Sequence, residues 1–310
     1  MKPEVSIIIV NYKTPELIVD CVQSLEKYVR STSYEIIVVD NESSAGSVAL
    51  MQKACPRIKI IANPTNSGFG EGNNIGVRHA QGDFVFLTNS DTVLREDSIT
   101  PLVNFLKKHP EAAMVGPAVF LADGSRQSRI CGNSPTIRRL VNDALLLSVL
   151  LPASWEFAQG LHREYFKEDE TKVDWISGVC MLIRRAAYDK VNGFNPDFFL
   201  YSEDIDLCLR IARHCGPIYH LSKYGIIHSH GASSKSEEDR LRNSVMQQGN
   251  FLLLLPSVLA PSQFKKAKVI MKTGLWIRLF IGYLLITLRH PKGSFLVRSC
   301  RARLDILNKD

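Results

Sequence analysis

The sequence predicts an α/β protein built on a doubly wound, mostly parallel sheet flanked by helices, with an amphipathic helical extension near the C-terminal end. Short apolar runs rich in Ile and Val alternate with segments whose apolar residues recur at helical spacing. This alternation is typical of parallel strands joined by right-handed helical crossovers. With 310 residues, 45% of them hydrophobic and 22% charged, the chain can bury a substantial core.

The first strand–helix–strand unit is the clearest. Residues 5–10 form a continuous apolar run, as expected for a strand that is buried on both faces. Thr14 and Pro15 then suit the N-cap and the first turn of a helix. Residues 35–39 form a second buried strand, which ends at Asp40.

The remaining elements follow the same rhythm up to about residue 110. They are a helix over residues 48–54, a strand over 59–61, a helix over 72–80, a strand over 83–87 and a helix over 99–108. After residues 114–117 the pattern is irregular over residues 121–170. Further along, it predicts a strand over 175–183, helices over 186–191 and 205–213, and short strands over 218–221 and 226–228.

The net charge of +7 is concentrated in one part of the chain. Residues 261–310 carry a net charge of +9, so the preceding 260 residues are close to neutral. The seven cysteines show neither C-x-x-C pairs nor zinc-site spacing, which predicts reduced, buried thiols in a cytosolic protein. No charged leader or cleavage site precedes the first strand, so no secretory signal is expected.

The basic C-terminal part combines Lys and Arg with apolar side chains at helical spacing, among them Trp276, Phe280 and Leu284. Its uncharged run, residues 279–288, has ten residues and is too short to span a bilayer. A helix lying in the membrane interface fits this pattern, and a helix packed on the protein body with a solvated basic face is the alternative. Nucleic-acid binding is not expected, because the interleaved apolar residues suit lipid better than a phosphate backbone.

Polar side chains follow three of the predicted strands where each strand ends. In parallel sheets, ligands bind beyond the carboxyl ends of the strands. We therefore expect three groups to converge on one crevice: Asn11 with Tyr12, Asp40 with Asn41, and Asn89 with Ser90 and Asp91.

The loops that characterise two common classes of nucleotide-binding enzyme are missing from the sequence. The turn after the first strand, residues 11–15, contains no glycine, although a dinucleotide fold needs glycine there for the backbone to approach a pyrophosphate. The glycine-rich residues 66–74 lack the G-x-G-x-x-G spacing, and no P-loop sequence is present. A nicotinamide dehydrogenase and a P-loop enzyme are thus both disfavoured.

The acids at the strand ends suit two kinds of contact. Asp40 can accept hydrogen bonds from a nucleobase or a ribose, or it can cap the following helix. Asn89 and Asp91 point the same way along an extended chain, so Asp91 can hold a hard cation such as Mg²⁺ beside phosphate oxygens. A simple β-turn is the alternative for these residues.

Two later segments also carry chemistry. Glu203 and Asp204 open a helix after an aromatic-rich loop, where a carboxylate can act as a general base or can merely favour the helix dipole. His228 and His230 follow a short strand and are candidate metal ligands, although a single histidine is more often structural.

In their order and spacing, these segments resemble the family-2 glycosyltransferases, which have the GT-A fold. The resemblance covers about residues 3–235, in blocks at residues 5–12, 37–41, 66–76, 87–91, 175–185, 193–210 and 227–233. The N-x-G-x-x-x-G-N-N pattern at residues 66–74 is similar to the rhamnosyltransferase-like branch. The Q-x-x-R-W signature of processive synthases is missing, so repeated polymerisation is not expected.

The resemblance implies a role for each matching residue. Donor binding falls to Asn11, Tyr12, Asp40, Asn41, Asn66, Gly68, Asn73, Asn74, Asn89 and Ser90. The acceptor side falls to Trp175, Ser177, Gly178 and Glu203, and the catalytic base is Asp204. Asp91 and His228 would bind Mg²⁺ or Mn²⁺, with His230 as the second choice; Asn89 replaces the first acid of the family's D-x-D motif.

The implied reaction is a single displacement that inverts the anomeric centre of a nucleoside-diphosphate sugar, with dTDP-rhamnose as the first donor expected. The implied acceptor is a saccharide or lipid-linked saccharide of a bacterial surface polymer, reached from the inner face of the cell membrane. We expect a donor-binding half over residues 1–117, an acceptor-binding half over 118–235 and a membrane-associating extension over 236–310. The alternatives are a nucleotidylyltransferase and a non-catalytic nucleotide-sugar-binding protein.

Overall fold

The computed structural model describes residues 2–147, 168–229 and 236–308. Their contacts form two compact units. The first unit contains the described parts of 1–132, 166–199 and 203–230, and the second contains those of 133–165, 200–202 and 231–310. The predicted C-terminal extension therefore shares its unit with residues 133–147, which the sequence had assigned to the acceptor-binding half.

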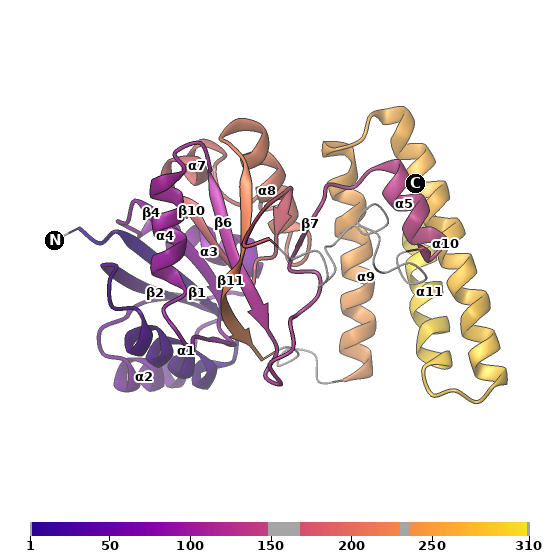
Figure 1. Cartoon of the computed structure of the whole chain (residues 1–310). Helices are drawn as coiled ribbons and strands as arrows, with labels where there is room; N and C mark the ends of the chain where they lie inside the picture. Colours follow the sequence, from indigo (N-terminus) through magenta and orange to yellow (C-terminus); the bar gives the residue numbers. More distant parts are fainter. Residues whose placement is uncertain (1, 148–167, 230–235, 309–310) are drawn as a thin grey trace. The chain divides into compact units, whose positions relative to one another are not determined.

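The first unit is centred on a mostly parallel sheet, which confirms the predicted fold class (Figure 1). Among the described residues, the strand order is β3-β2-β1-β4-β10-β6-β11-β5, with β8 also paired to β11. The strands are β1 (Val5–Asn11), β2 (Tyr34–Asn41), β3 (Lys59–Asn63), β4 (Phe84–Asn89), β5 (Thr92–Val93), β6 (Met114–Phe120), β8 (Glu170–Val173), β10 (Cys180–Arg184) and β11 (Ile218–His228). Strand β10 runs antiparallel to both β4 and β6.

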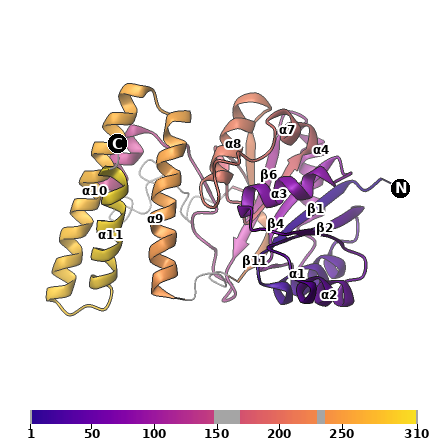
Figure 2. The same ribbon diagram turned by 180° about the vertical axis from the view of Figure 1, so that it is seen from behind.

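Helices cover both faces of this sheet. They are α1 (Pro15–Tyr28), α2 (Ala45–Ala54), α3 (Gly68–Arg78), α4 (Ile99–Lys108), α7 (Arg185–Lys190) and α8 (Glu203–His214). Figure 1 shows α4 in front of the sheet, and Figure 2, seen from behind, shows α3 and α8 in front of the opposite face. The apolar strands lie between these layers, and Ile7, Ile8 and Ile9 of β1 are fully buried.

Two predicted boundaries differ from the observed ones. The strand expected over residues 175–183 is two strands, β9 (Trp175–Ile176) and β10, because the chain leaves the sheet between them. β9 pairs instead with β7 (Cys131–Gly132). The two short strands expected over residues 218–228 are one strand, β11, whose register shifts between Leu221 and Gly225.

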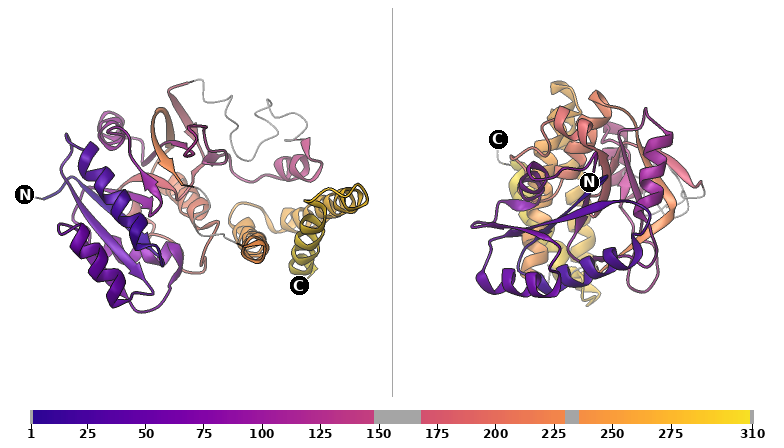
Figure 3. Two further views of the ribbon diagram at one scale, coloured as in Figure 1. Left: turned by 90° about the horizontal axis from the view of Figure 1, so that it is seen from below. Right: turned by 90° about the vertical axis from the view of Figure 1, so that its left-hand side faces the viewer.

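The second unit is helical. It contains α5 (Ile137–Ala144), α9 (Glu237–Leu254), η3 (Leu255–Ser257), α10 (Pro261–Thr287) and α11 (Gly293–Asn308). Helices α10 and α11 lie side by side (Figures 1 and 3). Close packing is possible because α10 has glycine at the contacts: a Cβ on Gly274 would meet Ala144 of α5 at 2.8 Å, and one on Gly282 would meet Val297 of α11 at 2.8 Å.

By length and composition, α10 could cross a membrane. The observed helix has 27 residues. The ten-residue uncharged run at residues 279–288 is therefore no reason to exclude a membrane span. Arg278 interrupts the apolar part of this helix, and its guanidinium pairs with Asp143 at 3.2 Å.

Candidate active site

The carboxyl ends of β1 and β2 bring Asn11 and Asp40 together. These residues are direct partners in the parallel register. Asn11 Nδ2 donates to Asp40 Oδ1 at 2.6 Å, and Ser43 Oγ donates to the other carboxylate oxygen at 2.7 Å. The N-cap of α2 is Ser44 and not Asp40, because the side chain of Ser44 accepts from Ser47. The capping alternative for Asp40 is therefore wrong.

Thr14 connects this pair to the end of β4. Its N–H and its hydroxyl both lie within hydrogen-bond distance of Asn11 Oδ1, at 3.1 and 3.2 Å. Its hydroxyl also lies 3.3 Å from Ser90 Oγ. The side chains after β1, β2 and β4 thus form one connected polar network, as the topology predicts, in which Asn11 and Asp40 are buried. Tyr12, by contrast, is 45% exposed.

Strand β11 brings His228 to Asp91. The short strand β5 pairs antiparallel with β11, so that Thr92 lies opposite His228. His228 Nε2 then lies 3.0 Å from Asp91 Oδ1 and 3.4 Å from Asn89 Nδ2. Both side chains of the Asp91–His228 pair are nearly buried, with exposures of 12% and 7%. His230 lies outside the described residues.

The Asp91–His228 pair fits a divalent cation. Adjacent ligands of a metal with bond lengths of about 2.1 Å stand about 3.0 Å apart, which is the separation observed here. Among the described residues no group of three or more His, Cys, Asp and Glu is placed to hold a metal. Two protein ligands suit Mg²⁺ or Mn²⁺, which usually take further oxygens from substrate phosphates and water.

Asp204 is held near the end of β4 by the segment between β9 and β10. Gly178 N–H donates to Asp204 Oδ2 at 2.8 Å, and Ile205 N–H lies 2.8 Å from Oδ1. The next residue, Val179, accepts from Asn89 N–H at 3.0 Å. Asp204 is thereby connected to the D-x-D position through two consecutive residues. The backbone just before Asp204 is strained, since Tyr201 and Ser202 have φ of 74° and 68°.

The neighbouring acids Glu203 and Asp204 differ in environment. Glu203 is 4% exposed and its Oε2 atom has no partner among the described residues. Burial, together with the charge of Asp204, raises the pKa of Glu203 to about 8. Burial also raises the pKa of Asp204, but backbone N–H donors favour its charged form. The backbone donors to Asp204, set against the unpartnered Oε2 of Glu203, therefore favour Asp204 as the charged member of the pair.

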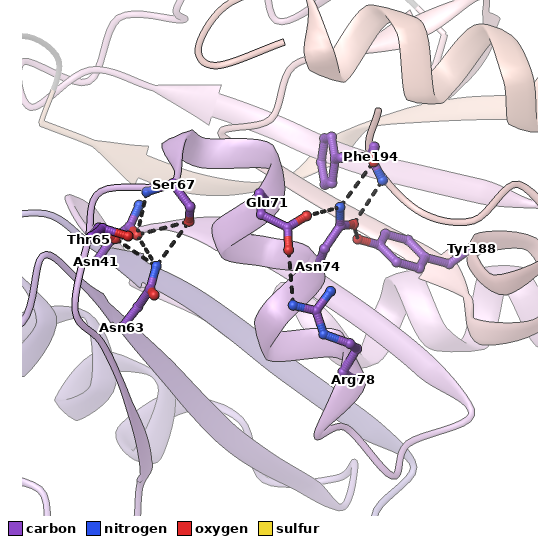
Figure 4. Close-up of polar contacts among 9 residues, drawn as sticks. All are labelled: Asn41, Asn63, Thr65, Ser67, Glu71, Asn74, Arg78, Tyr188 and Phe194. Atoms are coloured by element: carbon purple, nitrogen blue, oxygen red, sulfur yellow. Dashed lines mark hydrogen bonds and ion pairs between the residues drawn. The ribbon is translucent and has the colours of Figure 1, made fainter. Parts of the chain in front are cut away.

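Asn41 organises the loop that precedes α3 (Figure 4). Its amide donates to Asn66 Oδ1 and to the Gly68 carbonyl, both at 3.0 Å. Its oxygen accepts from Asn63 at 2.8 Å and from Ser67 N–H at 3.1 Å. With these contacts, α3 begins at Gly68, four residues before the predicted start. The prediction missed this because the spacing of apolar residues carries no sign of hydrogen bonds between side-chain amides and the backbone.

Gly68 is required by the fold at this point. Its φ is +85°, and a Cβ there would lie 2.3 Å from the Phe199 carbonyl oxygen. That carbonyl accepts from Phe69 N–H at 3.1 Å. The glycine-rich segment therefore docks on the loop before α8 through its own backbone.

Asn73 and Asn74 point into the protein. Asn74 Nδ2 donates to Glu71 Oε2 at 2.9 Å and to the Phe194 carbonyl at 3.0 Å, while its oxygen accepts from Tyr188 Oη at 2.6 Å and Phe194 N–H at 2.9 Å (Figure 4). Four contacts saturate an asparagine amide. Asn73 is fully buried and donates to the Phe69 carbonyl at 2.9 Å. A ligand could reach Asn74 only by displacing one of these partners.

The acceptor-side residues are placed unevenly. Gly178 and Glu203 lie beside Asp204, and Ser177 N–H donates to the Ile130 carbonyl at 2.7 Å. Trp175 is only 8% exposed, in β9.

The sequence did not reveal two residues of the site. They are Thr14, which connects the strand ends, and Gln127, whose Oε1 lies 2.8 Å from His228 Nδ1. Thr14 was interpreted only as a helix cap, and no local signal marks Gln127.

Known proteins resemble this chain in sequence and in fold. Residues 6–191 match the family described as Glycosyl transferase family 2. The chain is 26% identical over 206 residues to the N-acetylglucosaminyl-diphospho-decaprenol L-rhamnosyltransferase of Mycobacterium tuberculosis (strain ATCC 25618 / H37Rv), covering 61% of this chain and 66% of that protein. It is 26% identical over 209 residues to rhamnosyltransferase WbbL of Escherichia coli (strain K12), covering 62% of this chain and 73% of that protein.

The fold is also found among solved structures. The mannosyltransferase PcManGT from Pyrobaculum calidifontis, solved in complex with GDP-Man and Mn²⁺, superposes with a TM-score of 0.60 at 15% identity. That superposition covers 98% of this chain and 88% of the other, and it shows a shared GT-A fold. The chain spans slightly less than two thirds of the Mycobacterium tuberculosis relative. Because the family match covers more than half of the chain, this protein belongs to glycosyl transferase family 2.

Proposed function

We propose that this protein is a metal-dependent, inverting glycosyltransferase that moves a sugar from a nucleoside diphosphate to a hydroxyl group of a saccharide or lipid-linked saccharide. One observation carries the proposal: a chain of short contacts joins Asp40, the Asn89–Asp91 segment and Asp204 at a single edge of the sheet. These are a donor-binding acid, a metal-binding acid and a base.

The donor would lie along the carboxyl ends of β1, β2 and β4. Asp40 is held by Asn11 and Ser43 in a fixed orientation, which leaves a carboxylate to accept hydrogen bonds from a ribose or a nucleobase. The loop fixed by Asn41 would lie against the ribose or the diphosphate. Asn41 holds this loop in shape, and the donor would contact its outer surface.

Asp91 and His228 would hold the divalent cation. When bound, the ion offsets the negative charge that develops on the diphosphate leaving group. Asn89, in place of an acid, keeps the protein charge at this position lower and lies within 3.4 Å of His228 Nε2.

Asp204 would remove the proton from the acceptor hydroxyl as that oxygen attacks the anomeric carbon. Its two backbone donors aim the carboxylate, and Glu203, carrying a proton, adds no second negative charge. General-base assistance of this kind typically contributes about 10²–10⁴ in rate. A single attack from the face opposite the leaving group inverts the anomeric configuration.

The donor we favour is dTDP-rhamnose, since two relatives are named as rhamnosyltransferases. The acceptor we favour is a lipid-linked saccharide of a surface polymer, since one relative is named for a diphospho-decaprenol substrate. The test is mass spectrometry of products from a panel of nucleotide sugars, with a membrane extract as acceptor source. Transfer from one donor that requires Mg²⁺ or Mn²⁺ supports the proposal. Nucleotidyl transfer to a sugar phosphate, or no turnover with any donor, contradicts it.

The second unit would bind a membrane surface through α10. Its exposed face carries an apolar stripe with the following exposures: Val269 63%, Trp276 61%, Phe280 73%, Leu284 51% and Leu288 67%. The opposite face packs on α5 and α11, so the stripe is available along the length of the helix. Exposed basic residues near its two ends are Lys265, Lys266, Arg289 and Lys292, which suit anionic lipid headgroups. This would keep the enzyme peripheral, on the cytoplasmic leaflet beside a lipid-linked acceptor.

A further inference from the structure

Gln127 lies on the return arm of a short hairpin after β6, and three contacts fix its position. Its N–H donates to the Val119 carbonyl at 2.8 Å. The preceding residue, Arg126, forms a β-bridge with Phe120 and donates through its guanidinium to the Ser222 carbonyl at 3.0 Å. The hairpin is therefore tied to both β6 and β11, and the latter strand carries His228.

Gln127 and Asp91 face the two different ring nitrogens of His228. Gln127 Oε1 lies 2.8 Å from His228 Nδ1, and a carbonyl oxygen can only accept a hydrogen bond. With a cation bound at the Asp91–His228 pair, Nδ1 would carry the proton and donate it to Gln127. The lone pair of the neutral ring would then be on Nε2, the atom that lies 3.0 Å from Asp91 Oδ1.

We propose that Gln127 is a positioning residue that holds His228 in its Nδ1–H tautomer, so that Nε2 faces Asp91 as a metal ligand. The inference rests on the proposed function, because it assumes a divalent cation at this pair. Histidines that bind metals are usually oriented in this way, by an acceptor on the nitrogen that does not bind the metal. An amide performs this role without adding negative charge beside Asp91.

The first test reads the tautomer directly, with the diamagnetic cation Mg²⁺ at saturating concentration. Two-bond ¹H–¹⁵N spectra of the full-length protein, at a pH where the imidazole is neutral, distinguish the protonated ring nitrogen from the unprotonated one. The signals of His228 are identified as those missing from His228→Gln. We expect the Nδ1–H form in the wild type and in Gln127→Glu, whose carboxylate also accepts. We expect Gln127→Leu, which cannot accept, to shift toward the Nε2–H form.

The second test follows Mn²⁺ alone, through paramagnetic broadening of the same signals. We expect the apparent Kd to rise about 10–100-fold in Gln127→Leu and to stay near the wild-type value in Gln127→Glu. The control is Ser128→Ala, an exposed neighbour in the same hairpin, which should change neither reading.

The outcomes distinguish a failure of the role assigned to Gln127 from a failure of the proposed metal site. A Gln127→Leu protein that keeps the wild-type tautomer, or the wild-type Mn²⁺ affinity, overturns the role of Gln127. Equal loss of Mn²⁺ binding in Gln127→Leu and Gln127→Glu also overturns it, because it indicates a packing effect. If Mn²⁺ does not broaden the His228 signals of the wild type, the metal site fails as a proposal and the assignment of Gln127 as a metal-site residue fails with it. Only the hydrogen bond to His228 then stands.

Discussion

Gly178 donates its N–H to Asp204 Oδ2 at 2.8 Å, whereas the adjacent Glu203 has an oxygen with no partner among the described residues. The two consecutive acids therefore differ in orientation and in protonation. Asp204 is oriented by backbone donors, and Glu203 is buried with its proton.

This difference predicts that amide substitutions of the two acids affect the transfer rate differently. Asp204→Asn should lower the transfer rate by about 10²–10⁴ while leaving donor affinity unchanged, because only the base is lost. Glu203→Gln should change the rate little at pH 7, since an amide resembles a protonated carboxyl group. Steady-state rates with donor affinity from calorimetry check both. A large loss in Glu203→Gln with near-normal transfer in Asp204→Asn would reverse the assignment.

Glu203 should also make the stability of the protein depend on pH. Its pKa is about 8 in the folded protein and 4.5 ordinarily, so between these values the native state binds more protons than the unfolded state. The stability of the wild type therefore falls as pH rises from about 4.5 to about 8. Glu203→Gln removes this loss, so its advantage over the wild type should grow with pH, to the order of a few kcal/mol.

Urea denaturation of the two proteins at pH 5 and pH 8 measures this difference. Glu96→Gln is the control, because that side chain is exposed. A Glu203→Gln protein whose difference from the wild type is the same at both pH values would show that Glu203 does not hold a proton in the native state.

Asn74 should matter for stability as much as for activity. Replacing it by Ala removes four hydrogen bonds and leaves the N–H and C=O of the buried Phe194 without this partner. We expect a loss of about 2–4 kcal/mol in the free energy of unfolding. Asn104→Ala, at an exposed position of α4, is the matched control and should be close to neutral. Equal unfolding energies for the two variants would mean that Asn74 is not a structural clamp.

The stripe on α10 should bind vesicles that contain phosphatidylglycerol more strongly than vesicles of phosphatidylcholine alone. The double variant Phe280→Glu/Leu284→Glu should lose sedimentation with both, because it places two charges in the apolar stripe. Ser262→Glu/Gln263→Glu adds the same charge at exposed positions in the first turn of α10 and should retain most of the binding. If the wild-type protein fails to sediment with anionic vesicles, the membrane contact is wrong.

The sequence predicts what is encoded locally. The buried strand at residues 5–10 and the acids at the strand ends follow from apolar runs and from the rule for parallel sheets, and the structure confirms their convergence. The placement of β10 between β4 and β6 does not follow, because an antiparallel strand that arrives from far along the chain leaves no trace in local periodicity.

The surroundings of His228 likewise could not be predicted from the local sequence. Gln127 and His228 are 101 residues apart in sequence and meet only because a hairpin after β6 reaches β11. The inward orientation of Asn74 is likewise set by its contacts with Tyr188 and Phe194, on elements that the sequence could not place beside α3.

The claim on which the account depends is that a divalent cation binds at the Asp91–His228 pair beside the donor site. Anomalous diffraction at the manganese edge, from crystals grown with Mn²⁺ and dTDP, tests it most directly. We predict one strong peak at about 2.2 Å from an oxygen of Asp91 and from His228 Nε2, with the nucleotide extending toward Asp40. A manganese peak away from this pair, or density for the nucleotide with no metal beside Asp91, would contradict the account.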